Sequence, residues 1–403
     1  MAFTAQDHLF MSRALQLAEQ GLFTTYPNPR PNPRVGCVIV KDGKIVGEGA
    51  HLKAGESHAE VFALRQAGAL ANGATAYVTL EPCSHTGRTP PCSQALIDAG
   101  ITKVIAAMQD PNPLVAGNGL AHLQRHGVEV SSGLMQTQAE ALNLGFISRM
   151  TRNTPYVRSK IAASLDGKTA LNNGVSQWIT SEAARADVQY WRARSCAILT
   201  GVGTVLADNP SMTMRATAPS LLMRESAIGF PASVGTKEPN AGVKGWESAA
   251  IRQPLKVIVD STLKTPIDAK ILQGGNALIA FAHDAEDKSA ALLATDAELL
   301  CVPNAQGKVC LKTLLAHLAA REINEVLVEG GEGLNGALLA QNLIDELLIY
   351  FAPKLMGGAA RSMFAMPALS QMSEAIDLQI LEVRHIGTDI RLRARPVSKQ
   401  YAD

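Results

Sequence analysis

The stretch Glu56-Ser57-His58-Ala59-Glu60-Val61, ESHAEV, places a histidine two residues before a glutamate at the predicted start of a helix. One interpretation is local, because Ser57 and Glu60 have the spacing of a capping box, in which each side chain binds a backbone N–H of the first turn. The other is chemical: His58 would be a metal ligand and Glu60 its proton-transferring partner. Residues elsewhere in the chain distinguish the two.

A second stretch, EPCSHTGRTPPC at 81–92, supplies two cysteines. Cys83 follows a predicted strand and Cys92 opens a predicted helix. Together with His58 they offer three zinc ligands and leave the fourth position open for water, as in catalytic rather than structural sites. Glu60 is placed to take a proton from that water and pass it to a leaving amine. We interpret this as a catalytic zinc site rather than a zinc knuckle or buried thiols, although Ser57 can still cap the helix.

The motif is typical of one class of enzymes. H-x-E followed by P-C-x-x-C is the signature of zinc-dependent nucleobase deaminases. In this chain eight residues, rather than two, separate Cys83 from Cys92. The sequence therefore predicts a deaminase with an unusually long cysteine loop.

Length and composition limit the remaining possibilities. A chain of 403 residues is too long for one core and predicts two domains. A net charge of +1 indicates no basic surface for nucleic acid or membrane. The N-terminus lacks the pattern of a signal peptide, and six sparse cysteines favour free thiols or a metal over disulfides. We expect a cytoplasmic protein with no nucleic-acid or membrane partner.

Strand and helix patterns alternate along the whole chain, which indicates an α/β fold with a first domain at 1–150 and a second at 151–403. The stretch 216–253 lacks periodicity and is expected to be a loop insertion. In the first domain we predict strands at 35–40, 44–51, 74–80 and 103–108, with helices at 7–20, from 57, at 92–98 and at 137–148. In the second we predict strands at 156–170, 197–200, 256–260, 277–281, 326–330 and 346–353, with helices at 181–194, 311–321 and 334–342.

Several motifs together resemble one family. HAE at 58–60, TLEPCSHTGRTPPC at 79–92 and QDPNPLVAGNG at 109–119 resemble the deaminase half of the RibD family, the bifunctional enzymes of riboflavin biosynthesis. Four further motifs resemble the reductase half of the same family: KIAASLDGKTA at 160–170, SQWIT at 176–180, TGVGTVLADNPSMTMR at 200–215 and VEGGEGLNGALL at 328–339. The resemblance implies a cytidine-deaminase-like three-layer domain followed by a dihydrofolate-reductase-like domain, with Zn²⁺ and NADPH as cofactors.

For the first domain, the resemblance implies hydrolytic deamination of 2,5-diamino-6-(5-phosphoribosylamino)pyrimidin-4-one with release of ammonia. His58, Cys83 and Cys92 would bind zinc and Glu60 would be the proton donor. The pyrimidine pocket would contain Asn32, His51, Asp110 and Asn112.

Each pocket residue has a plainer alternative. Asp110 and Asn112 lie in DPNP, which is also a turn sequence, and His51 could be a partly buried histidine with internal hydrogen bonds. The doubled PNPRPNPR at 27–34 allows either Asn28 or Asn32 in the pocket. We favour Asn32 because it directly precedes a strand.

For the second domain, the resemblance implies reduction of the ribosyl group of 5-amino-6-(5-phosphoribosylamino)uracil to ribityl by NADPH. Gly331-x-Gly333-x-x-Gly336 between a strand and a helix suits a phosphate, but it occurs too late in its domain for a Rossmann fingerprint. Lys160 would be catalytic, since a cation favours arrival of hydride. Substrate contacts would come from Ser176, Arg192, Met212, Arg215 and Glu329, and NADPH contacts from Ala162, Trp178, Thr204, Asp208, Ser261, Gly331, Glu332, Gly333, Leu334, Asn335, Gly336 and Ala337.

Two of these residues have alternative readings, and two other functions compete. Arg192 could lie on a solvated helix face, and Trp178 could belong to the core. A zinc deaminase with a catalytically silent second domain is possible, although Lys160, Asp208 and Glu329 argue against it. A zinc-stabilised nucleic-acid-binding module is disfavoured by the net charge and by 4% aromatic residues. The resemblance implies small phosphoribosylamino-pyrimidine substrates and a homo-oligomer, a dimer or tetramer.

Overall fold

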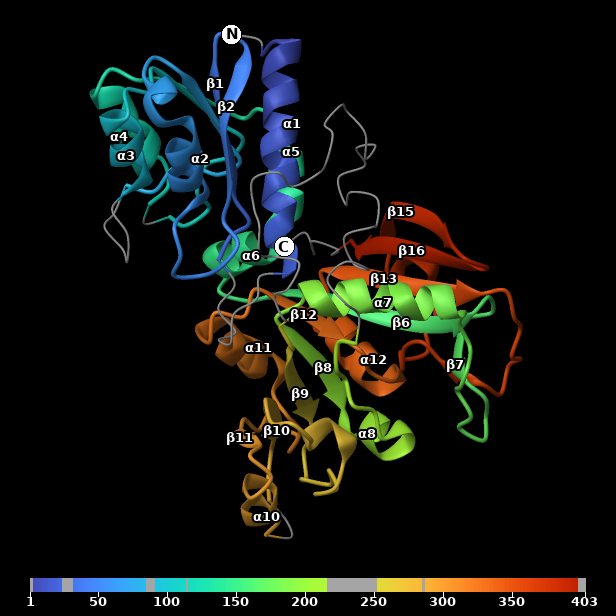
Figure 1. The fold of residues 1–403 in the computed structure, drawn as a ribbon. Coiled ribbons are helices and arrows are strands. Elements are labelled where there is room, and N and C mark those ends of the chain that lie inside the picture. Colours follow the sequence, from blue (N-terminus) through green and yellow to red (C-terminus); the bar gives the residue numbers. More distant parts are fainter. Residues whose placement is uncertain are drawn as a thin grey trace. The chain divides into compact units, whose positions relative to one another are not determined.

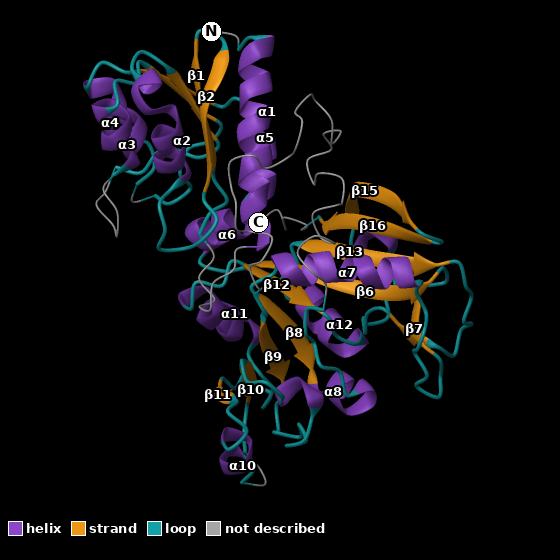
Figure 2. Ribbon diagram, in the orientation of Figure 1, coloured by secondary structure: helices purple, strands orange, loops and turns teal. Residues whose placement is uncertain are grey.

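The computed structural model describes residues 3–23, 32–84, 91–113, 115–215, 252–284 and 287–397. These residues form two compact units, and the chain passes from the first to the second between Asn153 and Thr154 (Figure 1). Both units mix helices and strands, as predicted (Figure 2). Asn28 and nearly all of the expected insertion at 216–253 lie outside the described residues. Among the described residues, no helix has the length and apolar character needed to cross a membrane.

The first unit is built on a five-stranded sheet with the strand order β2-β1-β3-β4-β5. β1 is antiparallel to β2 and β3, whereas β3, β4 and β5 run parallel. The Asp-Gly turn of the predicted hairpin has φ values of 49° and 73°, as a type I′ turn requires. The strands are β1 (Gly36–Lys41), β2 (Lys44–Ala50), β3 (Thr75–Val78), β4 (Lys103–Ala106) and β5 (Glu129–Ser132). The helices are α1 (Ala5–Glu19), α2 (Ala59–Ala67), α3 (Cys92–Asp98), α4 (Asn118–Arg125), α5 (Gln136–Leu142) and α6 (Leu144–Arg152), with 3₁₀ turns η1 (Gln20–Phe23) and η2 (Gly68–Ala71).

Two glycines show that helices cover both faces of this sheet. A Cβ on Gly36 in β1 would lie 1.9 Å from the carbonyl oxygen of Ala14 in α1. A Cβ on Gly49 in β2 would lie 2.0 Å from the carbonyl oxygen of Ala59 in α2. Gly49 pairs with Cys37, the neighbour of Gly36, so the two glycines face opposite sides of the sheet. The unit therefore has the expected three layers, helix, sheet and helix.

Some predicted details of the first unit are wrong. The capping box is absent: α2 begins at Ala59, and its N-cap is His58, which makes no side-chain capping bond. The helix predicted at 137–148 is two helices, because Asn143 leaves the helical conformation and its side chain binds the backbone N–H and C=O of Arg34 at 2.8 and 3.0 Å. The patterns also do not predict α4, which has no capping side chain, or the polar strand β5.

The second unit contains a nine-stranded sheet with the order β11-β10-β9-β8-β12-β6-β13-β16-β15 and a small β14-β7 pair. Strands from β11 to β13 are parallel, and β16 and β15 are antiparallel additions. The patterns do not predict β11, β14, β15 or β16, and β15 is largely exposed, so it lacks a buried apolar face. The strands are β6 (Tyr156–Ser164), β7 (Lys168–Ala170), β8 (Ala197–Gly201), β9 (Leu255–Val259), β10 (Ala277–Phe281), β11 (Glu298–Cys301), β12 (Glu325–Val328), β13 (Glu346–Ala352), β14 (Arg361–Ser362), β15 (Leu378–Ile386) and β16 (Asp389–Pro396). The helices are α7 (Glu182–Arg194), α8 (Val202–Asp208), α10 (Ser289–Leu293), α11 (Leu311–Ala320) and α12 (Glu332–Ala340), with 3₁₀ turns η3 (Lys270–Leu272) and η4 (Met372–Glu374).

A buried arginine ties the central strands of this sheet together. Arg158 in β6 is 0% exposed and forms ion pairs with Glu325 in β12, at 3.3 Å, and Glu346 in β13, at 3.1 Å. Removing one member of such a group would leave a buried charge unpaired, which is strongly destabilising. Because Val328 pairs with Ser159 in register, the next residues, Glu329 and Lys160, are brought to the same end of the sheet.

Candidate active sites

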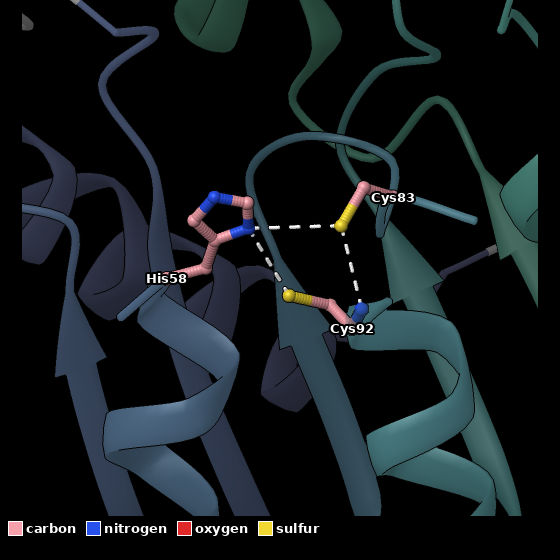
Figure 3. Close-up of side chains that lie close together, drawn as sticks. All are labelled: His58, Cys83 and Cys92. Carbon is pink, nitrogen blue, oxygen red and sulfur yellow. Dashed lines mark hydrogen bonds between the residues drawn. The ribbon is translucent and has the colours of Figure 1, made fainter. Parts of the chain in front are cut away.

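In the first unit, three ligand atoms converge at the ends of a strand and two helices. His58 Nδ1 lies 3.2 Å from Cys92 Sγ and 3.6 Å from Cys83 Sγ (Figure 3). With Zn–S of about 2.3 Å and Zn–N of about 2.0 Å, nitrogen and sulfur ligands of a tetrahedral zinc lie about 3.5 Å apart. These three atoms, all within 4.8 Å of one another, therefore fit a zinc ion.

Each ligand is held by a different element. His58 is the N-cap of α2, and Cys92 is the first residue of α3. Cys83 follows β3 in the chain, and its sulfur accepts the Cys92 backbone N–H at 3.3 Å. Ser93 donates its N–H and its hydroxyl to the Cys83 carbonyl at 3.1 and 3.0 Å. The helix N-termini and these bonds orient the sulfurs toward His58.

The two thiols shift each other's pKa in opposite directions. A hydrogen bond from Cys92 lowers the pKa of Cys83 to about 4, and the same bond raises the pKa of Cys92. Metal binding requires deprotonated ligands, and the lowered pKa of Cys83 favours its deprotonated form.

Glu60 lies in the first turn of α2, two residues after His58, and is almost completely buried, at 3% exposed. Burial raises its pKa to about 7, although the charge of His58 opposes this shift. Its Oε2 is a buried oxygen without a hydrogen-bond partner among the described residues. An unpaired buried carboxylate oxygen costs free energy, so its retention beside three metal ligands points to a reacting molecule as its partner.

Asn32 and His51 lie beside the zinc ligands. The His51 ring packs edge-on to the His58 ring, with centroids 5.3 Å apart. His51 Nδ1 lies 3.1 Å from the Ser57 carbonyl, which can only accept, so Nε2 accepts from the Asn32 amide at 2.9 Å. Burial lowers the pKa of His51 and keeps it neutral. The Asn32 amide is thereby oriented with its oxygen away from His51.

Asp110 and Asn112 lie in the segment that follows β4. Asp110 Oδ1 accepts the Asn112 backbone N–H at 2.8 Å, which is the turn expected of DPNP. The same segment is bonded to Glu81, a buried residue between β3 and Cys83 that the sequence analysis did not single out. The sequence contains one sign of a role for Glu81, since its carboxylate stands between a predicted buried strand and a proline. Its four hydrogen bonds could not be predicted, because their donors lie 29 to 39 positions further along the chain.

In the second unit, Lys160, Arg192 and Glu329 form a charged cluster. Arg192 donates from Nε and Nη2 to the two oxygens of Glu329 at 2.6 and 2.9 Å. Burial alone would raise the pKa of Glu329, but Arg192, Lys160 and Arg215 lower it to about 2. Burial also lowers the pKa of Lys160. Arg192 is 11% exposed in its side chain, so the reading of a solvated helix face is wrong.

Arg192 also reaches the segment that carries two more predicted residues. Its Nη1 donates to the Thr213 carbonyl at 2.9 Å, and Nη2 lies 3.9 Å from Met212 Sδ. Met212 is buried in a hydrophobic cluster, whereas Arg215 is exposed. Arg215 is close enough to Glu329 to lower its pKa. The structure therefore brings all the predicted substrate residues except Ser176 to one cluster around Glu329.

Ser176 lies instead with predicted cofactor residues. Its hydroxyl is 3.4 Å from Asp208 Oδ1, at the end of α8. A Cβ on Gly331 would lie 4.0 Å from Thr204 Oγ1, so Thr204 faces the glycine turn. Trp178 is 64% exposed beneath Arg185, whose Cζ is 4.5 Å from the ring centroid. The interpretation of Trp178 as a core residue is therefore wrong.

The glycine run opens α12, after β12, and its glycines serve different ends. A Cβ on Gly333 would meet open space among the described residues, and one on Gly331 would meet only Thr204. A Cβ on Gly336 would lie 2.2 Å from the Ala365 carbonyl oxygen, so this glycine permits close packing. Only the first part of the run is open to a phosphate.

The other predicted cofactor residues mainly contact the protein. Asn335 is buried, accepts the Ser159 hydroxyl at 3.1 Å and donates to the carbonyls of Gly330 and Met363. Glu332 accepts the Ser362 N–H at 3.1 Å, and Ser261 Oγ accepts the Val309 N–H at 3.2 Å. The remaining members lie on α12 or in β6 and are half-buried: Leu334, Ala337 and Ala162.

Comparison with known proteins gives the same division. Residues 4–108 match the family model for the cytidine and deoxycytidylate deaminase zinc-binding region, and residues 155–392 match the RibD C-terminal domain. Riboflavin biosynthesis protein RibD of Escherichia coli is 48% identical over 96% of this chain and 98% of its own. The Haemophilus influenzae protein of the same name is 44% identical over 98% and 99%. The solved structure of Acinetobacter baumannii RibD, form 1, superposes with a TM-score of 0.83 at 42% identity, covering 98% of this chain and 99% of that one.

The fold and the two sites define a bifunctional enzyme, in which a zinc-dependent deaminase domain precedes an NADPH-dependent reductase domain. The expected fold class is confirmed. The chain belongs to the RibD family of riboflavin biosynthesis proteins. A deaminase with a silent second domain is not favoured, because the match to the RibD C-terminal domain spans residues 155–392.

Proposed function

We propose that this enzyme catalyses two successive reactions of riboflavin biosynthesis. It first deaminates 2,5-diamino-6-(5-phosphoribosylamino)pyrimidin-4-one by hydrolysis and releases ammonia. It then reduces the ribosyl group of 5-amino-6-(5-phosphoribosylamino)uracil to ribityl with NADPH. The observation that carries the proposal is the zinc-ligand trio beside buried Glu60, whose Oε2 has no hydrogen-bond partner among the described residues, in a chain whose second unit matches the RibD C-terminal domain.

In the deaminase domain, which we assign to residues 1–150, His58, Cys83 and Cys92 hold the metal. Zinc, when bound, supplies an acidified water molecule as nucleophile. Glu60 would move a proton at Oε2, from the attacking water to the amine that leaves. Its burial supports this role, because a carboxylate screened by bulk water would transfer protons less selectively.

Around this centre, Asn32, His51, Asp110 and Asn112 orient the pyrimidine. Neutral His51 holds the Asn32 amide so that its oxygen is free to accept a hydrogen bond from a ring or amino N–H. Asp110 and Asn112 contribute from the segment after β4, at the carboxyl end of the parallel strands, where α/β sheets commonly bind ligands. The position of Asn32 next to His51 supports the choice of Asn32 over Asn28.

In the reductase domain, which we assign to residues 151–403, Lys160 acts next to the carbon that is reduced. NADPH supplies hydride, and a cation at this place stabilises the negative charge that arrives. Glu329, held rigidly by Arg192, binds substrate hydroxyl groups. Arg215 provides an exposed guanidinium for the substrate phosphate, and Ser176 and Met212 complete the substrate contacts.

The opening of α12 would hold NADPH. Backbone N–H groups at Gly331 and Gly333 would be available to its phosphates, because the space beside these two glycines is open. Thr204 faces the same turn. Asp208 and exposed Trp178 add further contacts, and the Trp178 ring is available for stacking. The buried side chain of Asn335 and the half-buried side chain of Glu332 shape the turn through their bonds to the protein, while Ala162, Ser261, Leu334, Gly336 and Ala337 contribute surface or backbone.

We propose further that the enzyme works in the cytoplasm as a homo-oligomer, a dimer or tetramer. All six cysteines have free thiols, which is typical of a reducing compartment. Light scattering coupled to size-exclusion chromatography measures the oligomeric state; a monomer at micromolar concentration would contradict the second part.

The decisive experiment uses the zinc-loaded protein and the diaminopyrimidine phosphoribosylamine. Ammonia should appear without NADPH, and oxidation of NADPH should follow when the cofactor is added. Release of ammonia without later oxidation of NADPH would support the deaminase activity alone. A zinc-loaded sample that releases no ammonia would overturn the assigned substrate.

A further inference from the structure

The carboxylate of Glu81 collects four backbone N–H groups from one segment of the deaminase domain. Oε2 accepts from Asp110 at 3.1 Å and from Gly117 at 2.9 Å. Oε1 accepts from Gly119 at 2.8 Å and from Leu120 at 3.3 Å. Glu81 is 5% exposed. Since an ionised carboxylate has about four acceptor positions, these four N–H groups use all of them.

The backbone of Glu81 binds the same region. β3 and β4 are parallel neighbours, and Val78 pairs with Ala106 at their carboxyl ends. Beyond that pair, the Glu81 N–H donates to the Met108 carbonyl at 3.0 Å. Glu81 therefore lies between the zinc ligand Cys83, two residues further along the chain, and the segment that carries Asp110 and Asn112.

Helix α4 begins on this carboxylate and has no cap of its own. Its N-cap is Gly117, at φ +79°, which has no side chain to bind the first N–H groups. Such groups need an acceptor, and the positive end of a helix favours an anion. Glu81 supplies both from a distant part of the chain. The contact is close, because a Cβ on Gly119 would lie 1.9 Å from the carbonyl oxygen of Pro82.

From these contacts we propose that Glu81 is a positioning residue for deamination. It holds Asp110 and the start of α4 in place relative to the zinc ligands, and so presents Asp110 and Asn112 to the pyrimidine. It touches neither the substrate nor the metal. The inference rests on the proposed function, since it assigns Asp110 and Asn112 to the pyrimidine pocket.

Glu81→Gln tests this role, because the amide keeps the size of the side chain but loses two acceptor positions. Hydrogen exchange of the amides of Asp110, Gly117, Gly119 and Leu120 should be slow in the wild type. In the variant, at least two of them should exchange about 10-fold faster or more, as expected when a charged acceptor is removed. KM for the diaminopyrimidine should rise about 10-fold, because the charged acceptor that holds Asp110 is lost, and kcat should fall less. Zinc content and the reductase rate should not change.

Glu129→Gln is the matched control, since Glu129 makes only an exposed pair with Lys103; it should leave KM and exchange as in the wild type. Gly119→Ala tests the contact independently, because its Cβ would push the segment away from Pro82, and it should raise KM in the same way.

If Glu81→Gln folds poorly, the KM of the Gly119 variant and the hydrogen exchange of the wild type still test the proposal. Normal KM with unchanged exchange, or loss of zinc together with activity, would overturn the proposal. A wild type that releases no ammonia would overturn the proposed function instead, while the exchange data would still report on Glu81.

Discussion

Two buried glutamates, one in each unit, have pKa values that are shifted in opposite directions. Burial raises the pKa of Glu60 to about 7. Burial also acts to raise the pKa of Glu329, yet that pKa falls to about 2 because Arg192 binds both oxygens and Lys160 and Arg215 lie near. A buried carboxylate without an arginine partner can carry a proton, whereas one paired with arginine stays ionised. This difference supports the proposal that Glu60 transfers protons and that Glu329 binds substrate.

The largest effect on activity is expected from substitution of Glu60. Glu60→Gln keeps the shape but removes proton transfer, so the deamination kcat should fall by about 10²–10⁴-fold. Zinc content, measured by metal analysis, and reduction of separately supplied 5-amino-6-(5-phosphoribosylamino)uracil should be unchanged. Glu56→Gln, at an exposed neighbour, is the control. Near-normal ammonia release by the Glu60 variant would remove this residue from the mechanism.

Lys160 tests the charged cluster of the second unit in the same way. Lys160→Met should lower the rate of NADPH oxidation by about 10²–10³-fold, since a charge that stabilises the transition state is lost, and should spare ammonia release. Lys264→Met replaces an exposed lysine and should leave both rates unchanged. Equal loss of both activities in the Lys160 variant would indicate misfolding.

The pairing of Glu329 predicts a dependence of stability on pH. Its folded pKa of about 2 lies below the ordinary value of 4.5, so the charged form stabilises the fold above about pH 4.5, and this contribution is lost as the pH falls toward 2. The shift corresponds to about 3 kcal/mol of unfolding free energy. Urea unfolding followed by tryptophan fluorescence should show wild type losing this advantage over Glu329→Gln between pH 5 and pH 2.5. A difference that stays constant with pH would contradict the pairing.

The smallest effect is expected at a residue that the resemblance assigns to NADPH and the structure places inside the protein. Asn335→Ala leaves the Gly330 and Met363 carbonyls without their amide donor, so the unfolding free energy should fall by about 1–3 kcal/mol. Gln341→Ala, on the exposed end of α12, should change it by less than about 0.5 kcal/mol. If Asn335→Ala weakens NADPH binding without changing stability, its side chain contacts the cofactor directly.

The two sites also differ in how much of them could be predicted. The zinc trio depends on residue types that bind zinc and on their places at the ends of predicted elements, so His58, Cys83 and Cys92 are visible in the sequence. The capping box had an equally clear pattern and is absent, because α2 begins after His58. A short motif states which bonds are possible, and the packing of the chain selects among them.

Residue chemistry and local periodicity were enough to predict the two α/β units, the soft ligand set and the early and late positions of the two motifs. Which polar groups are already paired depends instead on the folded arrangement of the chain. Arg192 holds Glu329, Asn335 faces inward and Glu81 binds a segment far along the chain. A buried polar group must find a partner, and that partner is chosen by strand order and helix placement, which no local pattern contains.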